Sequence, residues 1–150
     1  MGTGVLGGTR QGTSMSVRIL VADDHAAIRR LLRRLLEAHH PDWEVCAEAA
    51  DGAEALEKFQ IRNPDLVVID LAMPKMNGLQ AAREIARMKP QTPMLLLTVQ
   101  QVSPQLRDEA RKAGFRGAVS KDTGDEVVRG LEALLRDETY FAGDGPNVAA

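Results

Sequence analysis

Acidic side chains follow two apolar segments of this chain, at the points where predicted strands end. Asp70 comes directly after the run 66–69, and Asp23 and Asp24 follow the run 17–22. Apolar runs rich in β-branched residues are typical of strands buried in a parallel sheet, and open α/β sheets bind ligands outside the carboxyl ends of their strands. We therefore expect the three carboxylates to lie together at one edge of a sheet.

Two further predicted strands bring a hydroxyl and an ammonium group to the same edge. Thr98 follows the run 94–97, and Lys121 follows the run 117–120. Unit charges about 4 Å apart interact by roughly 4 kcal/mol at an effective dielectric near 20, so clustered carboxylates favour a divalent cation, and an all-oxygen site with waters suits Mg²⁺. A carboxylate can act as a nucleophile and form an acyl phosphate, while an ammonium binds phosphoryl oxygens through charge-assisted hydrogen bonds. The set predicts phosphoryl chemistry on a carboxylate.

The elements that position these residues alternate between extended and helical. Strands are expected at 17–22, 43–49, 66–69, 94–97 and 115–120, and helices at 25–38, at 51–63, from 78, at 104–114 and from 124. This alternation predicts right-handed crossovers and a parallel sheet covered by helices on both faces. We expect an α/β fold with a doubly wound, five-stranded parallel sheet in the flavodoxin-type order 2-1-3-4-5.

Capping signals and apolar spacing define the predicted helices more closely. Asp51 with Glu54 and Thr123 with Glu126 each have the spacing of a capping box. Helical spacing predicts a buried face on the helix 25–38 made of Ile28, Leu31, Leu32, Leu35 and Leu36. The same reasoning places a second set inward on the last helix: Val127, Val128, Leu131, Leu134 and Leu135.

Length and composition bound the class of protein. A chain of 150 residues with 44% hydrophobic and 27% charged residues is expected to form one globular domain. We expect 1–16 to be a disordered leader, 17–136 the domain, and 137–150 a tail whose Tyr140 and Phe141 either pack on the domain or stay mobile. The net charge of −2 gives no support to nucleic-acid binding, and no apolar stretch is long enough to span a membrane. The single cysteine, Cys46, fits a reducing cytoplasm.

From about residue 17 to residue 136, these features resemble the receiver domain of two-component response regulators. The matching motifs, in chain order, are Leu20-Val21-Ala22-Asp23-Asp24, Val68-Ile69-Asp70-Leu71-Ala72-Met73-Pro74, Asn77-Gly78, Leu97-Thr98 and Lys121. Each motif is weak alone, but their order and their places at strand ends are specific. The Asp-Asp-His start and the long first helix look most like receivers that precede helix-turn-helix output domains.

The resemblance implies a role for each residue at the predicted edge. Asp70 would be the phosphoacceptor. Asp23, Asp24 and Asp70 would hold Mg²⁺ together with the backbone carbonyl of Ala72. The remaining two residues, Thr98 and Lys121, would bind the phosphoryl oxygens.

The resemblance also implies partners. The phosphoryl donor would be a phosphohistidine on a sensor histidine kinase or a phosphotransfer protein, and the domain would be a cytoplasmic switch rather than an enzyme. A homodimer through the face formed by the predicted elements 104–114, 115–120 and the last helix is possible. Arg29, Arg30, Arg33 and Arg34 form a basic stripe on the first helix, which is either a solvated face or the surface that docks the kinase.

Some positions depart from the family pattern. An aromatic residue usually stands three positions before the lysine, where this chain has Ala118; alanine commonly follows the threonine, where it has Val99; and proline often follows the lysine, where it has Asp122. In the family, two variable positions flank the path of the hydrolytic water, and here they are Ala72 and Gln100. Since the Ala72 side chain cannot orient a water, we expect slow autodephosphorylation.

Alternatives remain open at this point. Haloacid-dehalogenase-type phosphatases also use Mg²⁺ and a strand-end aspartate, but their second acid would fall at Ala72. A flavodoxin-like FMN protein would need a hydroxyl-rich phosphate loop where Asp23 and Asp24 stand. Within the receiver interpretation, the chain is either free-standing or the receiver portion of a longer DNA-binding transcription regulator.

Overall fold

The computed structural model describes residues 16–143, and the expected leader therefore lies, except for Ser16, outside the described residues. Its strands are β1 (Val17–Ala22), β2 (Trp43–Ala49), β3 (Leu66–Asp70), β4 (Met94–Thr98), β5 (Gly117–Ser120) and β6 (Tyr140–Phe141). All pairs are parallel, in the order β2-β1-β3-β4-β5-β6. The doubly wound fold and the order 2-1-3-4-5 are thus confirmed. The structure adds a short sixth strand from the segment that the sequence assigned to a tail.

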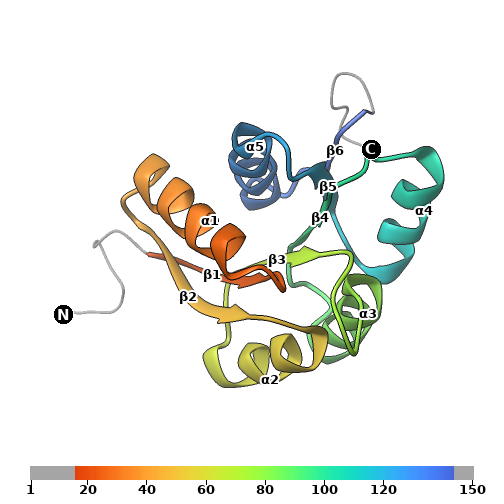
Figure 1. Ribbon diagram of the computed structural model, residues 1–150, viewed down its shortest axis with the longest axis horizontal. Coiled ribbons are helices and arrows are strands. Elements are labelled where there is room, and N and C mark those ends of the chain that lie inside the picture. Colours follow the sequence, from red (N-terminus) through yellow and green to blue (C-terminus); the bar gives the residue numbers. More distant parts are fainter. Residues whose placement is uncertain (1–15, 144–150) are drawn as a thin grey trace.

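Five helices cover this sheet within the described residues: α1 (Ala26–His39), α2 (Gly52–Arg62), α3 (Gly78–Met88), α4 (Pro104–Ala113) and α5 (Gly124–Leu135). Figure 1 shows α1 and α5 on one side of the sheet and α2, α3 and α4 on the other. Each side has its own apolar layer, since alternate residues of every strand point to opposite faces. Between residues 16 and 143, no helix is long and apolar enough to cross a membrane.

The two predicted capping boxes form only in part. The Glu54 carboxylate accepts the Ala50 N–H at 2.6 Å and not the N–H of Asp51, so the box at Asp51 is half formed. The Asp51 carboxylate accepts the Glu54 N–H at 2.8 Å, as an N-cap should. The capping box predicted at Thr123 is wrong, because its side chain makes no cap hydrogen bond. Glu126, the residue that would complete the box, instead accepts a hydrogen bond from the Tyr140 hydroxyl at 3.2 Å, so β6 takes the carboxylate away from the helix start.

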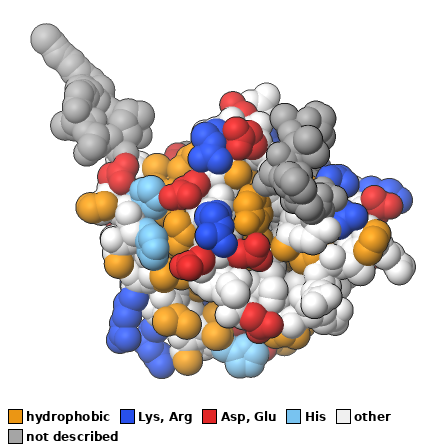
Figure 2. All heavy atoms as spheres, turned by 90° about the horizontal axis from the view of Figure 1, so that it is seen from above, with side chains coloured by type: hydrophobic (Ala, Val, Ile, Leu, Met, Phe, Trp, Pro, Cys, Tyr) orange, Lys and Arg blue, Asp and Glu red, His pale blue; other side chains and the backbone are white. Residues whose placement is uncertain are grey.

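The buried faces of α1 and α5 are narrower than their apolar spacing suggested. Leu32 and Leu36 are buried, but Leu31 is 59% exposed, and on α5 Leu135 is 43% exposed. The inward placement predicted for Leu31 and Leu135 is therefore wrong. Both lie at the edge of an apolar stripe that is wider than the surface on which the helix packs. Figure 2 views the side of the molecule that carries α1 and α5 and shows hydrophobic side chains exposed among charged ones.

Two arginines of the basic stripe serve the fold. Glu48 of β2 accepts from Arg29 Nε at 3.0 Å and from Arg33 Nη2 at 2.7 Å. Arg33 also donates to the Val45 carbonyl at 3.0 Å, and Arg29 donates to the Asp23 carbonyl at 2.6 Å. These contacts tie α1 to β2 and to the end of β1. Only the other two arginines of the stripe are left as an exposed basic surface.

Because of these contacts, we expect Glu48→Gln to destabilise the protein in a pH-dependent way. Burial raises the pKa of Glu48, but hydrogen bonds and charges from Arg33 and Arg29 outweigh it and hold the pKa below the ordinary 4.5. The unfolded chain therefore takes up this proton first as the pH falls. The contribution of Glu48 is fully present above pH 4.5 and is lost as the pH falls through the folded-state pKa.

Urea denaturation should give a loss of about 1 kcal/mol in the free energy of unfolding of Glu48→Gln at neutral pH, allowing for solvent screening of this partly exposed group. The difference from the unmodified protein should shrink as the pH falls through the folded-state pKa of Glu48, because the protonated carboxyl group resembles the amide of glutamine. A difference that stays constant over this range would contradict the assignment.

Candidate functional site

Strand register brings the predicted site residues to one edge of the sheet. Ala22 pairs with Ile69, so Asp23 and Asp70 follow on neighbouring strands. Asp70 pairs with Leu97, and Thr98 in turn pairs with Ser120, so Lys121 comes next at the same edge. Asp23, Asp70 and Thr98 are buried, and the Lys121 side chain is only 10% exposed. Tight packing of parallel strands thus produces a polar cluster that is shielded from water.

Lys121 joins the two buried carboxylates. Its Nζ lies 2.7 Å from Asp23 Oδ2 and 3.2 Å from Asp70 Oδ1. Asp23 Oδ2 is buried and accepts no aligned hydrogen bond, so this ion contact is its sole polar partner among the described residues. One ammonium therefore serves two carboxylates, and the site has spare acceptor capacity.

The charge balance at the edge is reflected in the acid strengths. Burial raises the pKa of Asp70, the neighbouring charge of Asp23 raises it further, and the opposing effect of Lys121 does not cancel this. Burial disfavours the charged form of Lys121, but its close contact with the Asp23 carboxylate, together with the charge of Asp70, raises its pKa above the ordinary value. Lysine remains charged, and the acids remain in excess of the cations that face them.

His25 belongs to this cluster, although the sequence analysis did not select it. Its Nδ1 lies 3.3 Å from Asp23 Oδ1 and 3.1 Å from Asp24 Oδ1, and its backbone N–H donates to Asp23 Oδ1 at 2.9 Å. One ligand atom from each of the three residues lies within 4.8 Å of the others. The signal was available in the sequence, since an aspartate commonly accepts the N–H two residues later and so turns that side chain back toward itself.

These residues fit a divalent cation. Asp23 Oδ2 accepts no hydrogen bond beyond its ion contact with Lys121, and the Asp24 carboxylate is partly exposed. These oxygens and the excess of negative charge are what a hard cation with oxygen ligands requires. Asp70 lies outside the group within 4.8 Å and is connected to it through Lys121. The side chain of Ala72 is exposed on the loop after β3. The predicted ligand set Asp23, Asp24, Asp70 and Ala72 is thus distributed over two adjacent strand ends.

The loop after β3 lies close to the end of the strand that carries Asp70 because of a glycine. A Cβ at Gly78 would lie 2.4 Å from the backbone oxygen of Asp70, which no side chain tolerates. Gly78 N–H donates to the Leu71 carbonyl at 2.9 Å, and Leu71 N–H donates to the Leu97 carbonyl at 2.8 Å. The start of α3 is therefore fastened directly to the ends of β3 and β4. Gly78 of the Asn-Gly motif permits this contact, and Asn77 caps α3 by accepting the Gln80 N–H at 2.9 Å.

Thr98 connects the edge to the loop that follows β4. Its Oγ1 accepts the Gln100 N–H at 3.1 Å. Val99, which stands where the family commonly has alanine, is 69% exposed, so its larger side chain faces solvent for most of its surface. Ala118 is fully buried in the apolar layer beneath α4, where the family pattern led us to look for an aromatic ring.

Comparison with known proteins agrees with this geometry. The family model for the response regulator receiver domain matches residues 19–133 of this sequence. The chain belongs to this family. The LuxR-family two-component response regulator from Aurantimonas sp. is similar in structure, with 35% identity and a TM-score of 0.80 over 86% of this chain and 91% of that one. The signal receiver domain of the putative response regulator NarL from Mycobacterium tuberculosis has 31% identity and a TM-score of 0.75. The match covers 82% of this chain and 98% of that one.

Curated relatives are longer than this receiver. The oxygen regulatory protein NreC of Staphylococcus epidermidis is 35% identical over 126 residues, which cover 83% of this chain and 57% of that protein. The protein-glutamate methylesterase/protein-glutamine glutaminase of Pyrococcus abyssi is 34% identical over 126 residues, covering 84% of this chain and 33% of that protein. The chain therefore spans about a third to a little over half of these relatives.

Opposite effects on stability are expected when either charge at the edge is removed in metal-free buffer. Asp70→Asn relieves repulsion with Asp23 and should raise the free energy of unfolding by about 1 kcal/mol, which corresponds to a few degrees in Tm. Lys121→Met leaves two buried carboxylates without their cation and should lower it by roughly 3 kcal/mol.

Thermal unfolding with a chelator present tests both changes, and Lys112→Met, at an exposed lysine of α4, is the matched control. A lower Tm for Asp70→Asn would show that Asp70 and Asp23 do not repel each other in the folded state. Equal effects of the two lysine variants would show that Lys121 does not compensate the buried carboxylates.

Proposed function

We propose that Asp70 is the phosphoacceptor of this receiver domain. A carboxylate oxygen of Asp70 attacks the phosphorus of a phosphohistidine, the new O–P bond forms as the P–N bond breaks, and the imidazole that leaves takes up a proton. The donor is a sensor histidine kinase or a phosphotransfer protein. The observation that carries this proposal is the Lys121 ammonium between two buried carboxylates, 2.7 Å from Asp23 and 3.2 Å from Asp70.

Each neighbouring residue has a role in this transfer. Asp23, Asp24 and Asp70, with the backbone carbonyl of Ala72, would hold Mg²⁺, which neutralises charge on the phosphoryl oxygens when bound. His25 keeps Asp23 and Asp24 oriented through its contacts at 3.3 and 3.1 Å. Lys121 can keep its contact with Asp23 and donate to a phosphoryl oxygen, which gains a charge-assisted hydrogen bond. Thr98 supplies a hydroxyl donor.

The proposed role is that of a switch without turnover. The phosphatase alternative loses support because Ala72 stands where its second acid would be, and the methylesterase relative shares only the receiver portion of its length. A cytoplasmic location suits a partner of a histidine kinase. We further propose that this receiver acts on an output domain, as in relatives named transcriptional regulators, either within a longer chain or as a separate protein.

A homodimer through the face formed by α4, β5 and α5 stays a prediction. In this chain β6 pairs with β5 along the edge that belongs to that face (Figure 1). Such a dimer would have to include β6 or displace it.

Acetyl phosphate with Mg²⁺ should add one phosphoryl group to the protein, seen as a mass increase of the intact chain. Asp70→Asn should abolish the addition, and Asp24→Ala should raise the Mg²⁺ concentration that is needed. Chelation of Mg²⁺ should slow labelling about tenfold or more, since a bound cation stabilises the transition state by several kcal/mol.

Asp51→Asn is the matched control, because it also replaces an aspartate by its amide while keeping a good helix cap. Labelling of Asp70→Asn equal to that of Asp51→Asn would refute the assignment of Asp70.

The phosphorylated state should be long-lived, and Ala72→Asn should shorten it several-fold. Asparagine can orient the attacking water beside the phosphoryl group, which alanine cannot do. Loss of the phosphoryl group with time, followed by intact mass, gives the rate. Unchanged decay with normal labelling would mean that Gln100, whose N–H is bound to Thr98, or access past Val99 sets the rate instead.

A further inference from the structure

The start of α1 carries an arginine at a place where the helix itself disfavours one. Arg29 is the fourth residue of the helix, the first turn has no acidic residue, and the N-cap His25 makes no side-chain cap hydrogen bond. A cation near a helix N-terminus opposes the helix dipole. Residues that break a local rule in this way are commonly kept for a contact elsewhere in the fold. The reason for Arg29 therefore lies in its tertiary contacts.

The Arg29 guanidinium connects the end of β1 to the neighbouring strand β2. Its Nη1 donates to the Asp23 carbonyl at 2.6 Å, and its Nε donates to Glu48 on β2 at 3.0 Å. The Arg29 side chain is 18% exposed and that of Glu48 is 25% exposed, so water has limited access to this pair. The Glu48 carboxylate thus anchors the guanidinium, which in turn holds a backbone carbonyl through a charge-assisted hydrogen bond.

The carbonyl that Arg29 holds belongs to the peptide group between the two acids of the proposed cation site. Asp23 has further bonds, because its N–H donates to the Ala49 carbonyl at 2.9 Å and its Oδ1 accepts the His25 N–H at 2.9 Å. Asp24 is held more loosely: its side chain is 32% exposed and contacts the His25 ring, itself 67% exposed, at 3.1 Å. The orientation of Asp24 therefore depends on the peptide group that Arg29 fixes.

We propose that Arg29 is a positioning residue that holds Asp23 and Asp24 in the arrangement that a divalent cation needs. The inference rests on the phosphoacceptor function and the Mg²⁺ site proposed above, and it names the residue that preorganises that site. Groups that bind the ligand residues without touching the metal keep those ligands oriented before the ion arrives. With Arg29 in place, the peptide group between the two acids cannot turn without breaking a charge-assisted hydrogen bond.

The charge of this arginine and its position predict opposite effects. A guanidinium beside a cation site repels the cation, so its removal would tighten cation binding if its charge were the larger effect. Its removal loosens binding if its role is to hold the peptide group between Asp23 and Asp24. Glu48, which is paired with the same guanidinium, offsets much of the charge and leaves position as the larger effect. The sign of the change in cation affinity therefore decides between the two.

Arg33 offers a matched control one turn further along α1. It also binds Glu48, at 2.7 Å through Nη2, and it also donates to a backbone carbonyl, that of Val45, at 3.0 Å. Within the described residues its remaining partner is Glu37 of the same helix. Replacement of Arg33 thus removes the same charge and a similar connection to β2, but it leaves the hydrogen bond to the Asp23 carbonyl in place.

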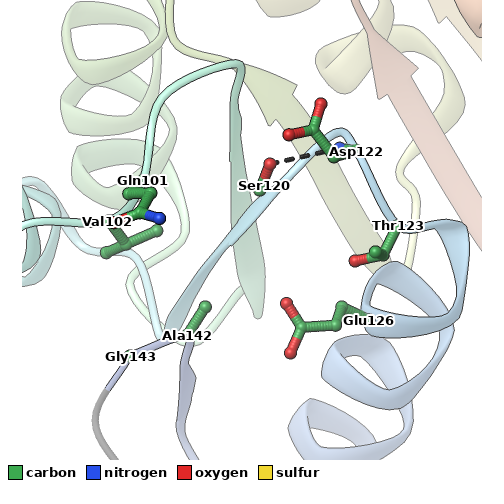
Figure 3. A pocket seen from close by; sticks show the side chains of 8 residues that line it. All are labelled: Gln101, Val102, Ser120, Asp122, Thr123, Glu126, Ala142 and Gly143. Carbon is green, nitrogen blue, oxygen red and sulfur yellow. Dashed lines mark hydrogen bonds between the residues drawn. The ribbon is translucent and has the colours of Figure 1, made fainter.

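The Lys121 end of the site is held by other bonds. The Lys121 N–H donates to the Thr98 carbonyl at 2.8 Å, and Ser120 Oγ accepts the Asp122 N–H at 3.1 Å, which closes a turn around Lys121. Figure 3 shows the bond between Ser120 and Asp122 beside a cavity of about 390 Å³ that both residues help to line. Arg29 takes no part in these contacts. Its loss should therefore leave phosphoryl transfer intact once the cation is bound.

Manganese ion alone is the probe for cation binding, added to the full chain without a phosphoryl donor and followed by the EPR signal of the free ion. Arg29→Met should raise the Kd for Mn²⁺ about tenfold, as the loss of a group that orients metal ligands does. Arg33→Met should leave the Kd unchanged. Arg29→Gln, which has a shorter neutral side chain, is the second variant if Arg29→Met does not fold, and Arg33→Gln is then its control.

Labelling by acetyl phosphate gives a readout that a merely structural role would not produce. In Arg29→Met, half-maximal labelling should need about tenfold more Mg²⁺, while the rate at saturating Mg²⁺ should stay near that of the unmodified protein. In Arg33→Met, neither quantity should change. A loss of fold stability alone would affect the two variants alike, because both arginines connect α1 to Glu48.

The outcomes separate this proposal from the function on which it rests. Tighter or unchanged Mn²⁺ binding by Arg29→Met, an equal loss in Arg33→Met, or a labelling rate that saturating Mg²⁺ does not restore would overturn the positioning role and leave Asp70 as phosphoacceptor. Mn²⁺ that binds Asp24→Ala as tightly as the unmodified protein would refute the proposed cation site, and labelling of Asp70→Asn would refute the phosphoacceptor. Either result would remove the role of Arg29 as well.

Discussion

The contact of one ammonium with two buried carboxylates is the interaction on which the remaining features of this receiver depend. Lys121 reaches Asp23 at 2.7 Å and Asp70 at 3.2 Å, across the ends of strands β1, β3 and β5. Carboxylates on adjacent strand ends would repel strongly in a site shielded from water. The ammonium makes this arrangement compatible with a folded sheet, and it leaves negative charge in excess. Such an edge is compatible with a stable sheet and leaves carboxylate oxygens that a hard cation could bind.

The backbone packs closely around the strand ends that carry these charges. Gly78 lets the loop after β3 lie against the Asp70 carbonyl, and the Gln100 N–H ties the next loop to Thr98. The loops after β3 and β4 are therefore bonded directly to the strand ends that carry Asp70 and Thr98. The absence of a ring at Ala118, and the supply of one by Phe141, extend the same apolar layer from β5 to β6.

On the α1 side of the sheet, arginine side chains bind structural partners. Arg29 and Arg33 donate hydrogen bonds to Glu48 and to backbone carbonyls, and these bonds hold α1 against β2. The basic stripe that the sequence suggested as a docking surface is thus divided between structural and exposed charges. Exposed Leu31 and Leu135 lie on the same side of the molecule, over α1 and α5.

The sequence alone determined the parallel α/β fold, the strand order 2-1-3-4-5 and the edge at which Asp23, Asp70, Thr98 and Lys121 meet. Strand periodicity and the rule that parallel strands present their carboxyl ends together make such features local in origin. Tertiary structure alone decided that Tyr140 and Phe141 form a sixth strand, that Glu126 binds Tyr140 instead of capping α5, and that Leu31 is exposed. Each of these depends on contacts between segments far apart in the chain. No local pattern encodes whether a two-residue strand will pair with β5 beside a residue as small as Ala118.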